Sequence, residues 1–322
     1  MDYCNIHEWR IVMFRRLFSL VIFTWLLVGC HHHTRETPPP IAQGNERQIA
    51  PFTRVYVSGT LNVTLHTGAL EPKVALSGDP RDLNYLHWNV KNGILHVTLG
   101  KGYPHYGQVS VDISTHYLST FNFHGVGTVT GVGLQSNLLD VSLANKGKTL
   151  LQGQINLRKL DVTGPGFTQI SGINSRYLQV KLAGKAHVQL DGVANLASLD
   201  INGKGWLSLY WVKSNALKVR AKDHVFFQLA GIADMLDVEL WDKARFNGRY
   251  LRSTRSFVKT HDTSEADIAV VKRQHTLADD KSNIYFYKLP EMKTDFMACN
   301  GAVLDMREWE RAFMKEPTRY NL

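Results

Sequence analysis

The side chains with the greatest chemical potential in this sequence are 14 histidines, three cysteines and a series of regularly spaced aspartates. The histidines are scattered and never form the His-Glu-x-x-His pattern of zinc peptidases. The Gly-x-Ser-x-Gly motif of hydrolases and the phosphate-binding loop are also missing. We therefore predict no catalytic residues, no metal site and no cofactor. A polysaccharide lyase or hydrolase stays as an alternative, because such enzymes place acidic residues in a groove without a linear motif.

The three cysteines do not form a Cys-x-x-Cys pair, so a structural zinc site is not expected. Cys30 ends a segment that reads as a secretory signal. The segment begins at Met13, continues with the basic pair Arg15-Arg16, and then has an apolar run at Leu17–Val28. This order is typical of an export signal, and the run is too short to span a membrane comfortably.

Leu27-Val28-Gly29-Cys30 resembles the lipobox of bacterial lipoproteins. That resemblance implies cleavage before Cys30 and acylation of its thiol and of the new amino terminus, which anchors the chain to a membrane. Residue 31 is His rather than Asp, which by the sorting rule of enteric lipoproteins implies the outer membrane. We expect a chain in the bacterial cell envelope, with residues 30–50 as a lipidated spacer.

A repeat of short strands fills the middle of the sequence. Its opening strands share an alternating apolar pattern and begin at Leu139, Leu160, Leu178, Leu199, Leu217 and Leu236. Successive starts are 18 to 21 residues apart, and each strand is followed by a corner of small residues and a second short strand. A period near twenty with two or three strands per unit indicates an all-β fold, a β-solenoid similar to a parallel β-helix.

Alternate residues of the opening strands are expected to point into the solenoid as an apolar column. Aspartates fall between them, on the outside, at Asp140, Asp161, Asp200 and Asp237. Gln179 and Lys218 occupy the same repeat position, and no Gly-Gly-x-Gly-x-Asp calcium motif occurs. We interpret these aspartates as a solvated face that keeps sheets from aggregating.

The second strand of each unit contains a candidate ligand strip. Counting back from the closing position of each unit gives an outward row with Lys148, Phe167, His187, Trp206, Phe226 and Lys243. A neighbouring row has Gln169, Gln189, Gln228 and Arg245. Aromatic faces beside amides and cations suit a sugar chain, although such ladders also stabilise solenoids by stacking. Both interpretations stay open.

The order of strands resembles the GIN domain, the head domain of auto-transporter adhesins. The resemblance rests on the opening strands Arg54–Gly59 and Leu61–Leu65, the next pair at Val74–Asp79 and Gly93–Val97, and Gly-x-Gly-x-Val at Gly125–Val129. It covers roughly residues 50–255 and implies a solenoid fold in a cell-envelope setting. It implies no reaction and no catalytic residues.

The predicted organisation is a signal peptide at 1–29, a spacer at 30–50, a solenoid at 51–291 and a tail or cap at 292–322. In the tail, Ala302–Met314 is expected to form an amphipathic helix, and Cys299 is expected to be a buried or free thiol.

The net charge of +9 favours anionic partners. We expect a membrane, through the lipid anchor, and a polysaccharide or another envelope or host surface component, but no nucleic acid. The leading hypothesis is a lipoprotein that presents a surface for binding or adhesion. The alternative is a purely structural envelope protein.

Overall fold

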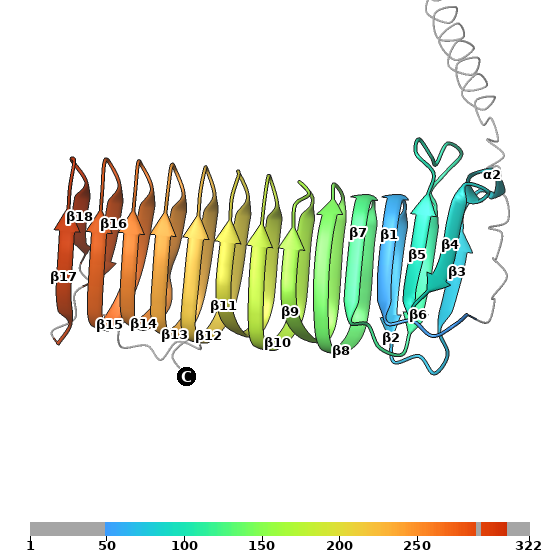
Figure 1. Ribbon diagram of the computed structural model, residues 1–322, viewed down its shortest axis with the longest axis horizontal. Coiled ribbons are helices and arrows are strands. Elements are labelled where there is room, and N and C mark those ends of the chain that lie inside the picture. Colours follow the sequence, from blue (N-terminus) through green and yellow to red (C-terminus); the bar gives the residue numbers. More distant parts are fainter. Residues whose placement is uncertain (1–48, 288–290, 308–322) are drawn as a thin grey trace, which may run out of the picture. The chain divides into compact units, whose positions relative to one another are not determined.

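The computed structural model describes residues 49–287 and 291–307. The predicted signal peptide and Cys30 lie outside these residues. Within them the chain is almost entirely β-strand, and its strands form one continuous sheet that winds into a solenoid (Figure 1). This confirms the all-β solenoid predicted from the sequence.

Long strands form most of the coils, each paired in parallel with the next. They are β8 (Thr128–Asn145), β9 (Lys148–Val162), β10 (Phe167–Leu182), β11 (His187–Ile201), β12 (Trp206–Ala221), β13 (Phe226–Leu240), β14 (Arg245–Thr260) and β15 (Glu265–Ala278). One column of residues in register runs through Thr128, Lys148, Phe167, His187, Trp206, Phe226, Arg245, Glu265 and Asn283. Its successive members are 18 to 20 residues apart, within the predicted range.

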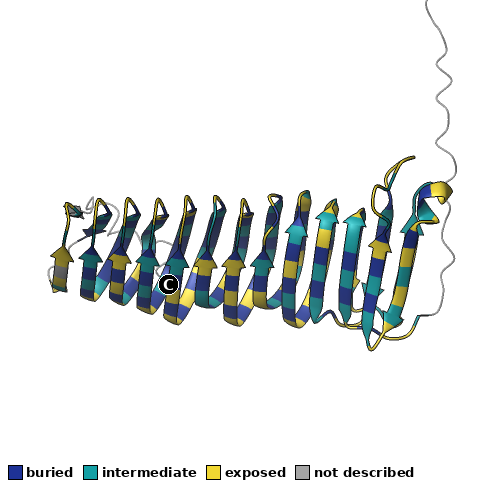
Figure 2. Cartoon of the chain, turned by 45° about the horizontal axis from the view of Figure 1, so that its top comes forward, coloured by how far each residue is buried: buried dark blue, intermediate teal, exposed yellow. Residues whose placement is uncertain are grey.

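Each long strand bends, and register shifts mark the bends. The first part of a strand, such as Phe167–Ser171, lies in one ladder, whose outward side we call face B. The last part, such as Lys218–Ala221, lies in a second ladder, whose outward side we call face A. Buried and solvent-accessible residues alternate along both ladders (Figure 2).

The core is the stack of inward side chains predicted from the repeat. All are buried in the solenoid: Leu139, Val141, Leu143, Leu178, Val180, Leu182, Leu236, Val238 and Leu240. Burial of one such side chain contributes roughly 1.5–3 kcal/mol, so a column repeated in every coil is the main source of stability. The outward aspartates Asp140, Asp161, Asp200 and Asp237 are partly or fully exposed, as expected.

The bend that follows face B alternates between two backbone conformations. One, with φ between 68° and 77°, occurs at Gly133, Gly172 and Trp211. The other, with φ between 135° and 158°, occurs at Gly153, Gly192 and Gly231. Members of each set are 39 residues apart, so the structural repeat is a pair of coils.

The corner that precedes face B contains a ladder of aspartates. Asp223, Asp242, Asp262 and Asp280 all have φ between 56° and 66°. The carboxylate Oδ2 of each accepts a hydrogen bond from the backbone N–H at the same position of the preceding coil, at 2.9, 3.1, 2.9 and 3.4 Å. Aspartate tolerates the left-handed backbone better than most side chains. These residues therefore hold the corner in shape.

The amino-terminal coils have an unusual strand order. Their elements are β1 (Arg54–Thr60), β2 (Asn62–Thr67), β3 (Lys73–Ser77), α2 (Pro80–Leu83), β4 (Leu86–Lys91), β5 (Ile94–Leu99), β6 (Ser110–Thr115) and β7 (Thr120–Val126). β1 lies between β5 and β7, and β2 between β6 and β8, all in parallel. β3 pairs antiparallel with β6, and β4 pairs antiparallel with β5; these two strands close the first coil. A hairpin turn at Asn92-Gly93 joins β4 to β5, with φ of 53° and 70°.

The short helix α2 fixes the loop between β5 and β6. Asp82 in this helix is fully buried, and its two carboxylate oxygens accept the backbone N–H groups of His105 and Tyr106, each at 2.8 Å. Asp79 caps the helix and pairs with Arg81. The hydrogen bonds from Arg81 lower the pKa of Asp79 to about 2.

The carboxyl-terminal coil contains β16 (Asn283–Tyr287), β17 (Lys293–Ala298) and β18 (Val303–Arg307). β17 pairs with β15 and β18 with β16. The helix predicted from Ala302 is therefore wrong for residues 303–307, and its remainder lies outside the described residues. The reason is the turn at Asn300-Gly301, with φ of 54° and 88°, which repeats the corner of the earlier coils and starts another strand.

Candidate binding surface

Face B brings the predicted aromatic residues into one column. Phe167, His187, Trp206 and Phe226 are direct neighbours in register on β10 to β13. Phe226 and His187 are exposed, and Phe167 and Trp206 are partly exposed. The next residue of each strand points inward and is buried, so the column lies on the outer surface. Lys148 precedes Phe167 in the same column.

The predicted amides form a second column beside the aromatic one. Gln169, Gln189, Ser208 and Gln228 are in register two residues further along each strand. The Gln189 amide donates to the Asp191 carboxylate at 3.3 Å, and the Gln228 amide donates to the Tyr210 hydroxyl at 3.1 Å. These contacts fix the amide orientations. Ser208 faces outward yet is only 1% exposed, because the neighbouring side chains cover it.

The structure corrects the predicted positions of the two basic residues at the end of the strip, Lys243 and Arg245. Arg245, not Lys243, is the residue in register with Phe226, and Asn247 rather than Arg245 is in register with Gln228. The predicted positions were two residues early, because Gly248 does not occupy the position of the earlier closing glycines. Gly231 is instead in register with Leu251.

Lys243 belongs to a column of basic side chains that was not predicted from the sequence. This column lies on the corner, two residues before the aromatic column, and contains Lys185, Lys204, His224 and Lys243, all exposed. Backbone hydrogen bonds link Lys204 to Gly184, His224 to Gly203 and Lys243 to Asp223, which keep the corners stacked. A signal was present, since a basic residue stands two positions before His187, Trp206 and Phe226 in the sequence.

Trp211 and Tyr210 extend the aromatic surface to the opposite edge of face B. Tyr210 is in register with Asp191, and Trp211 follows it in the bend. Trp211 has φ of 72° and is 38% exposed. A bulky residue in this backbone region is strained, by roughly 1–3 kcal/mol. Glycine stands at the two earlier bends of this kind, so the sequence pattern did not indicate an aromatic residue here.

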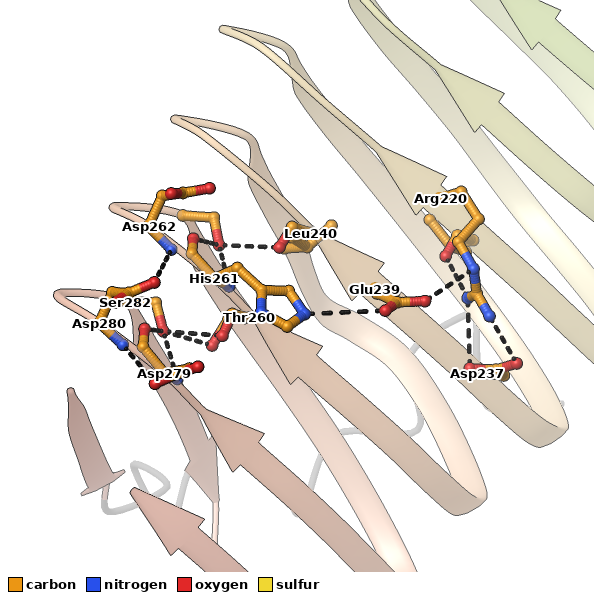
Figure 3. A network of polar contacts seen from close by, with 12 residues as sticks. Arg220, Asp237, Glu239, Leu240, Thr260, His261, Asp262, Asp279, Asp280 and Ser282 are labelled. Atoms are coloured by element: carbon orange, nitrogen blue, oxygen red, sulfur yellow. Dashed lines mark hydrogen bonds and ion pairs between the residues drawn. The ribbon is translucent and has the colours of Figure 1, made fainter. Parts of the chain in front are cut away.

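Several carboxylates of face A are paired with cations. Asp140 forms two hydrogen bonds with Arg158, which raise the pKa of that guanidinium. Arg220 contacts both Asp237, at 3.2 Å, and Glu239, at 3.1 Å, and His261 lies 3.7 Å from Glu239 (Figure 3). Asp140 and Asp237 are thus paired with cations, which supports the interpretation of this face as solvated.

Residues 49–287 and 291–307 contain no group of three or more His, Cys, Asp or Glu side chains that could hold a metal ion. No helix in the same part of the chain is long and apolar enough to cross a membrane. Cys299 is a free, half-buried thiol.

Known structures are similar to this chain. A crystal structure of a "putative adhesin" from Parabacteroides merdae is 12% identical, with 83% of this chain and 96% of that chain covered at a TM-score of 0.50. A "putative adhesin" from Parabacteroides distasonis is 12% identical, with 83% and 97% covered at a TM-score of 0.49. A "putative lipid binding protein" from the same species is 13% identical, with 82% and 95% covered at a TM-score of 0.45. At such identities, the first of these shows the fold alone. No curated protein matches the sequence.

The resemblance noted over residues 50–255 is confirmed for most of its length. Residues 51–205 match the family described as "Putative auto-transporter adhesin, head GIN domain". The matched segment includes the amino-terminal coils, Phe167, His187 and the first half of face B. The description of this family refers to adhesion and names no reaction. Over residues 51–205, the chain is therefore similar to the GIN-domain family.

Proposed function

We propose that this protein binds an extended anionic polysaccharide along face B. The observation that carries the proposal is the alignment of three outward columns, basic, aromatic and amide, which overlap over the coils of His187, Trp206 and Phe226. Aromatic faces stack on the C–H faces of sugar rings, amides exchange hydrogen bonds with hydroxyls, and the lysines attract acidic groups. Each kind of side chain has its own column, so successive coils offer similar contacts.

The spacing of the coils supports a polymeric ligand. Neighbouring strands lie about 4.8 Å apart, close to the length of one sugar unit in an extended chain. A polysaccharide parallel to the solenoid axis therefore places one ring on each coil. Its acidic groups lie toward Lys185, Lys204 and Lys243, and its hydroxyls toward the amides.

The setting of the protein is part of the same proposal. Acylation at Cys30 anchors the chain in the bacterial envelope, at the outer membrane, and the solenoid presents face B beyond the spacer. Mass spectrometry of the protein from its native membrane tests the anchor. A diacyl or triacyl mass on a peptide that begins at Cys30 is expected, and a mature chain that begins elsewhere would refute it.

The binding proposal is tested with an array of acidic and neutral polysaccharides. We expect the full chain to retain acidic polymers and to lose them as the salt concentration rises. A ring that covers one aromatic face removes about 80 Å² of apolar surface, counted on both partners, worth about 2 kcal/mol or roughly thirtyfold in affinity. Trp206→Ala and Phe226→Ala should each weaken binding by about that factor.

Tyr117→Ala is the matched control, because this aromatic residue is 54% exposed but lies outside the strip. Binding should be unchanged in this variant. Equal affinities in the wild type and in both strip variants would refute the proposal, as would a lack of binding to every polymer on the array.

A further inference from the structure

We propose that face A is the contact surface of an antiparallel dimer of this chain. The inference is independent of glycan binding, which uses face B. It starts from the central column of outward residues on face A. From the amino-terminal end, this column reads Asn122, Ser142, Asp161, Lys181, Asp200, Arg220, Glu239, Lys259, Leu277 and Met297.

The six charged residues of this column alternate strictly in sign. Within one chain, each charge has an opposite charge on the neighbouring coil, as in the 3.1 Å contact of Arg220 with Glu239. Such cross-strand pairs stabilise the solenoid. Because of the same alternation, the column is complementary in charge to a second copy of itself that runs in the opposite direction.

A two-fold axis across the solenoid, between the levels of Asp200 and Arg220, places two copies of face A against each other with opposite directions. Asp161 then meets the partner's Lys259, Lys181 meets the partner's Glu239, and Asp200 meets the partner's Arg220. A parallel dimer would place every charge against its own copy. A shift by one coil would oppose like charges, so charge selects both the direction and the register.

The uncharged ends of the column fit the same register. Asn122 and Ser142 border a hollow of about 360 Å³, whose lining also includes Tyr56, Phe123 and Ala144. The opposite end carries Met297, which is 60% exposed, and Leu277. In the dimer, the partner's Met297 and Leu277 lie over this hollow. The alignment that pairs opposite charges therefore also places an exposed apolar side chain over a hollow.

Each of the two columns that flank the central one also faces its own copy on the partner, without opposing like charges. On one side, Asp140 meets the partner's His275, and Lys159 meets the aromatic ring of the partner's Phe257. On the other side, the small Ala183 meets the partner's Trp241. No pair of like charges occurs in these two columns over the coils that the structure describes. The contact of three columns over ten coils covers about 700–900 Å² per copy, close to the size of stable interfaces.

A charge-swap cycle tests the dimer by sedimentation equilibrium of the full chain in a non-ionic detergent. The detergent prevents the apolar run at Leu17–Val28 from driving association. We expect a dimer at low ionic strength that dissociates in about 1 M salt. Asp161→Lys and Lys259→Asp each place like charges at two symmetric contacts and should weaken the dimer by about tenfold or more. The double variant should return to within about threefold of the wild type.

The double variant separates contacts between copies from those within one copy. Inside each copy, the changed side chains at positions 161 and 259 still lie beside the like charges of Lys181 and Glu239, so only the contact between copies is restored. Lys148→Asp, an equal charge change on face B, is the control and should leave the dimer unchanged. A monomeric wild type, a dimer insensitive to both single changes, or a double variant as weak as the single ones would overturn the proposal.

Discussion

The aspartate ladder at the corners makes a quantitative prediction at Asp262. Its Oδ2 accepts the backbone N–H of Asp242 at 2.9 Å, and its own φ is 60°. Two effects can therefore be separated by substitution: the loss of a hydrogen bond and the cost of a left-handed backbone. Asp262→Ala loses the bond and retains the backbone cost, Asp262→Gly loses only the bond, and Asp262→Asn retains an acceptor and tolerates this backbone.

The expected magnitudes follow from these two terms. The hydrogen bond contributes about 0.5–1.5 kcal/mol, and an alanine in this conformation costs roughly 1–2 kcal/mol. Asp262→Ala should thus destabilise the coil by about 2–3 kcal/mol and Asp262→Gly by about 1 kcal/mol. Asp262→Asn should be close to neutral, because removing one carboxylate from a row of like charges offsets any loss of hydrogen-bond strength.

Urea unfolding followed by tryptophan fluorescence is a suitable assay. Trp241 stacks on His261, with ring centroids 5.7 Å apart, and therefore reports on this corner. Global two-state behaviour is not needed, since a solenoid can unfold a few coils at a time. If Asp262→Asn were as destabilising as Asp262→Ala, the carboxylate charge itself would be required. The hydrogen-bond explanation would then be wrong.

Three further predictions concern the amino-terminal coils. Gly125→Ala should lower the free energy of unfolding by about 4 kcal/mol or more, because the new Cβ would overlap the Gly59 carbonyl oxygen. Gly133→Ala should lower it by roughly 1–2 kcal/mol, because the new Cβ meets no atom and only the backbone conformation is unfavourable. Thermal unfolding of the two variants compares these effects. Asp82→Ala should speed amide hydrogen exchange at His105 and Tyr106, since both N–H groups lose their acceptor; unchanged exchange would contradict the role of Asp82. The hydrogen bond with Tyr85 raises the pKa of Tyr103 to about 12, so tyrosinate absorbance should show one late ionisation that Tyr85→Phe moves earlier. Because the neutral phenol is favoured in the folded state, this contribution to stability is complete below about pH 10 and disappears between about pH 10 and 12.

The sequence predicts those features of the fold that depend on local pattern. The coil period, the inward apolar column and the hairpin at Asn92-Gly93 follow from alternation and turn chemistry. The aromatic column could also be aligned, since the coils between Phe167 and Phe226 differ in length by a single residue. Each of these features needs only the residues of one coil or of its neighbour.

Errors arose where the backbone bends in a way that residue types do not reveal. Counting from closing glycines misplaced Lys243 and Arg245 because Gly248 is not equivalent to Gly231. The left-handed backbone at Trp211 was hidden because a tryptophan gives no cue for it. The insertion of β1 between β5 and β7 could not be predicted either, since all three strands have the same alternating pattern and pair in parallel. Strand order in such a solenoid depends on tertiary packing.

The two proposals have a joint consequence that can be argued from geometry. A dimer through face A covers the alternating charges and leaves face B of each copy outside, with the aromatic columns running in opposite directions. A long polysaccharide that binds one copy then meets a second strip at a fixed distance, which raises its overall affinity without a new contact. The dimer-breaking change Lys259→Asp should therefore weaken binding of long polymers but not of short oligosaccharides. An equal loss for both lengths would show that residue 259 acts on the strip itself.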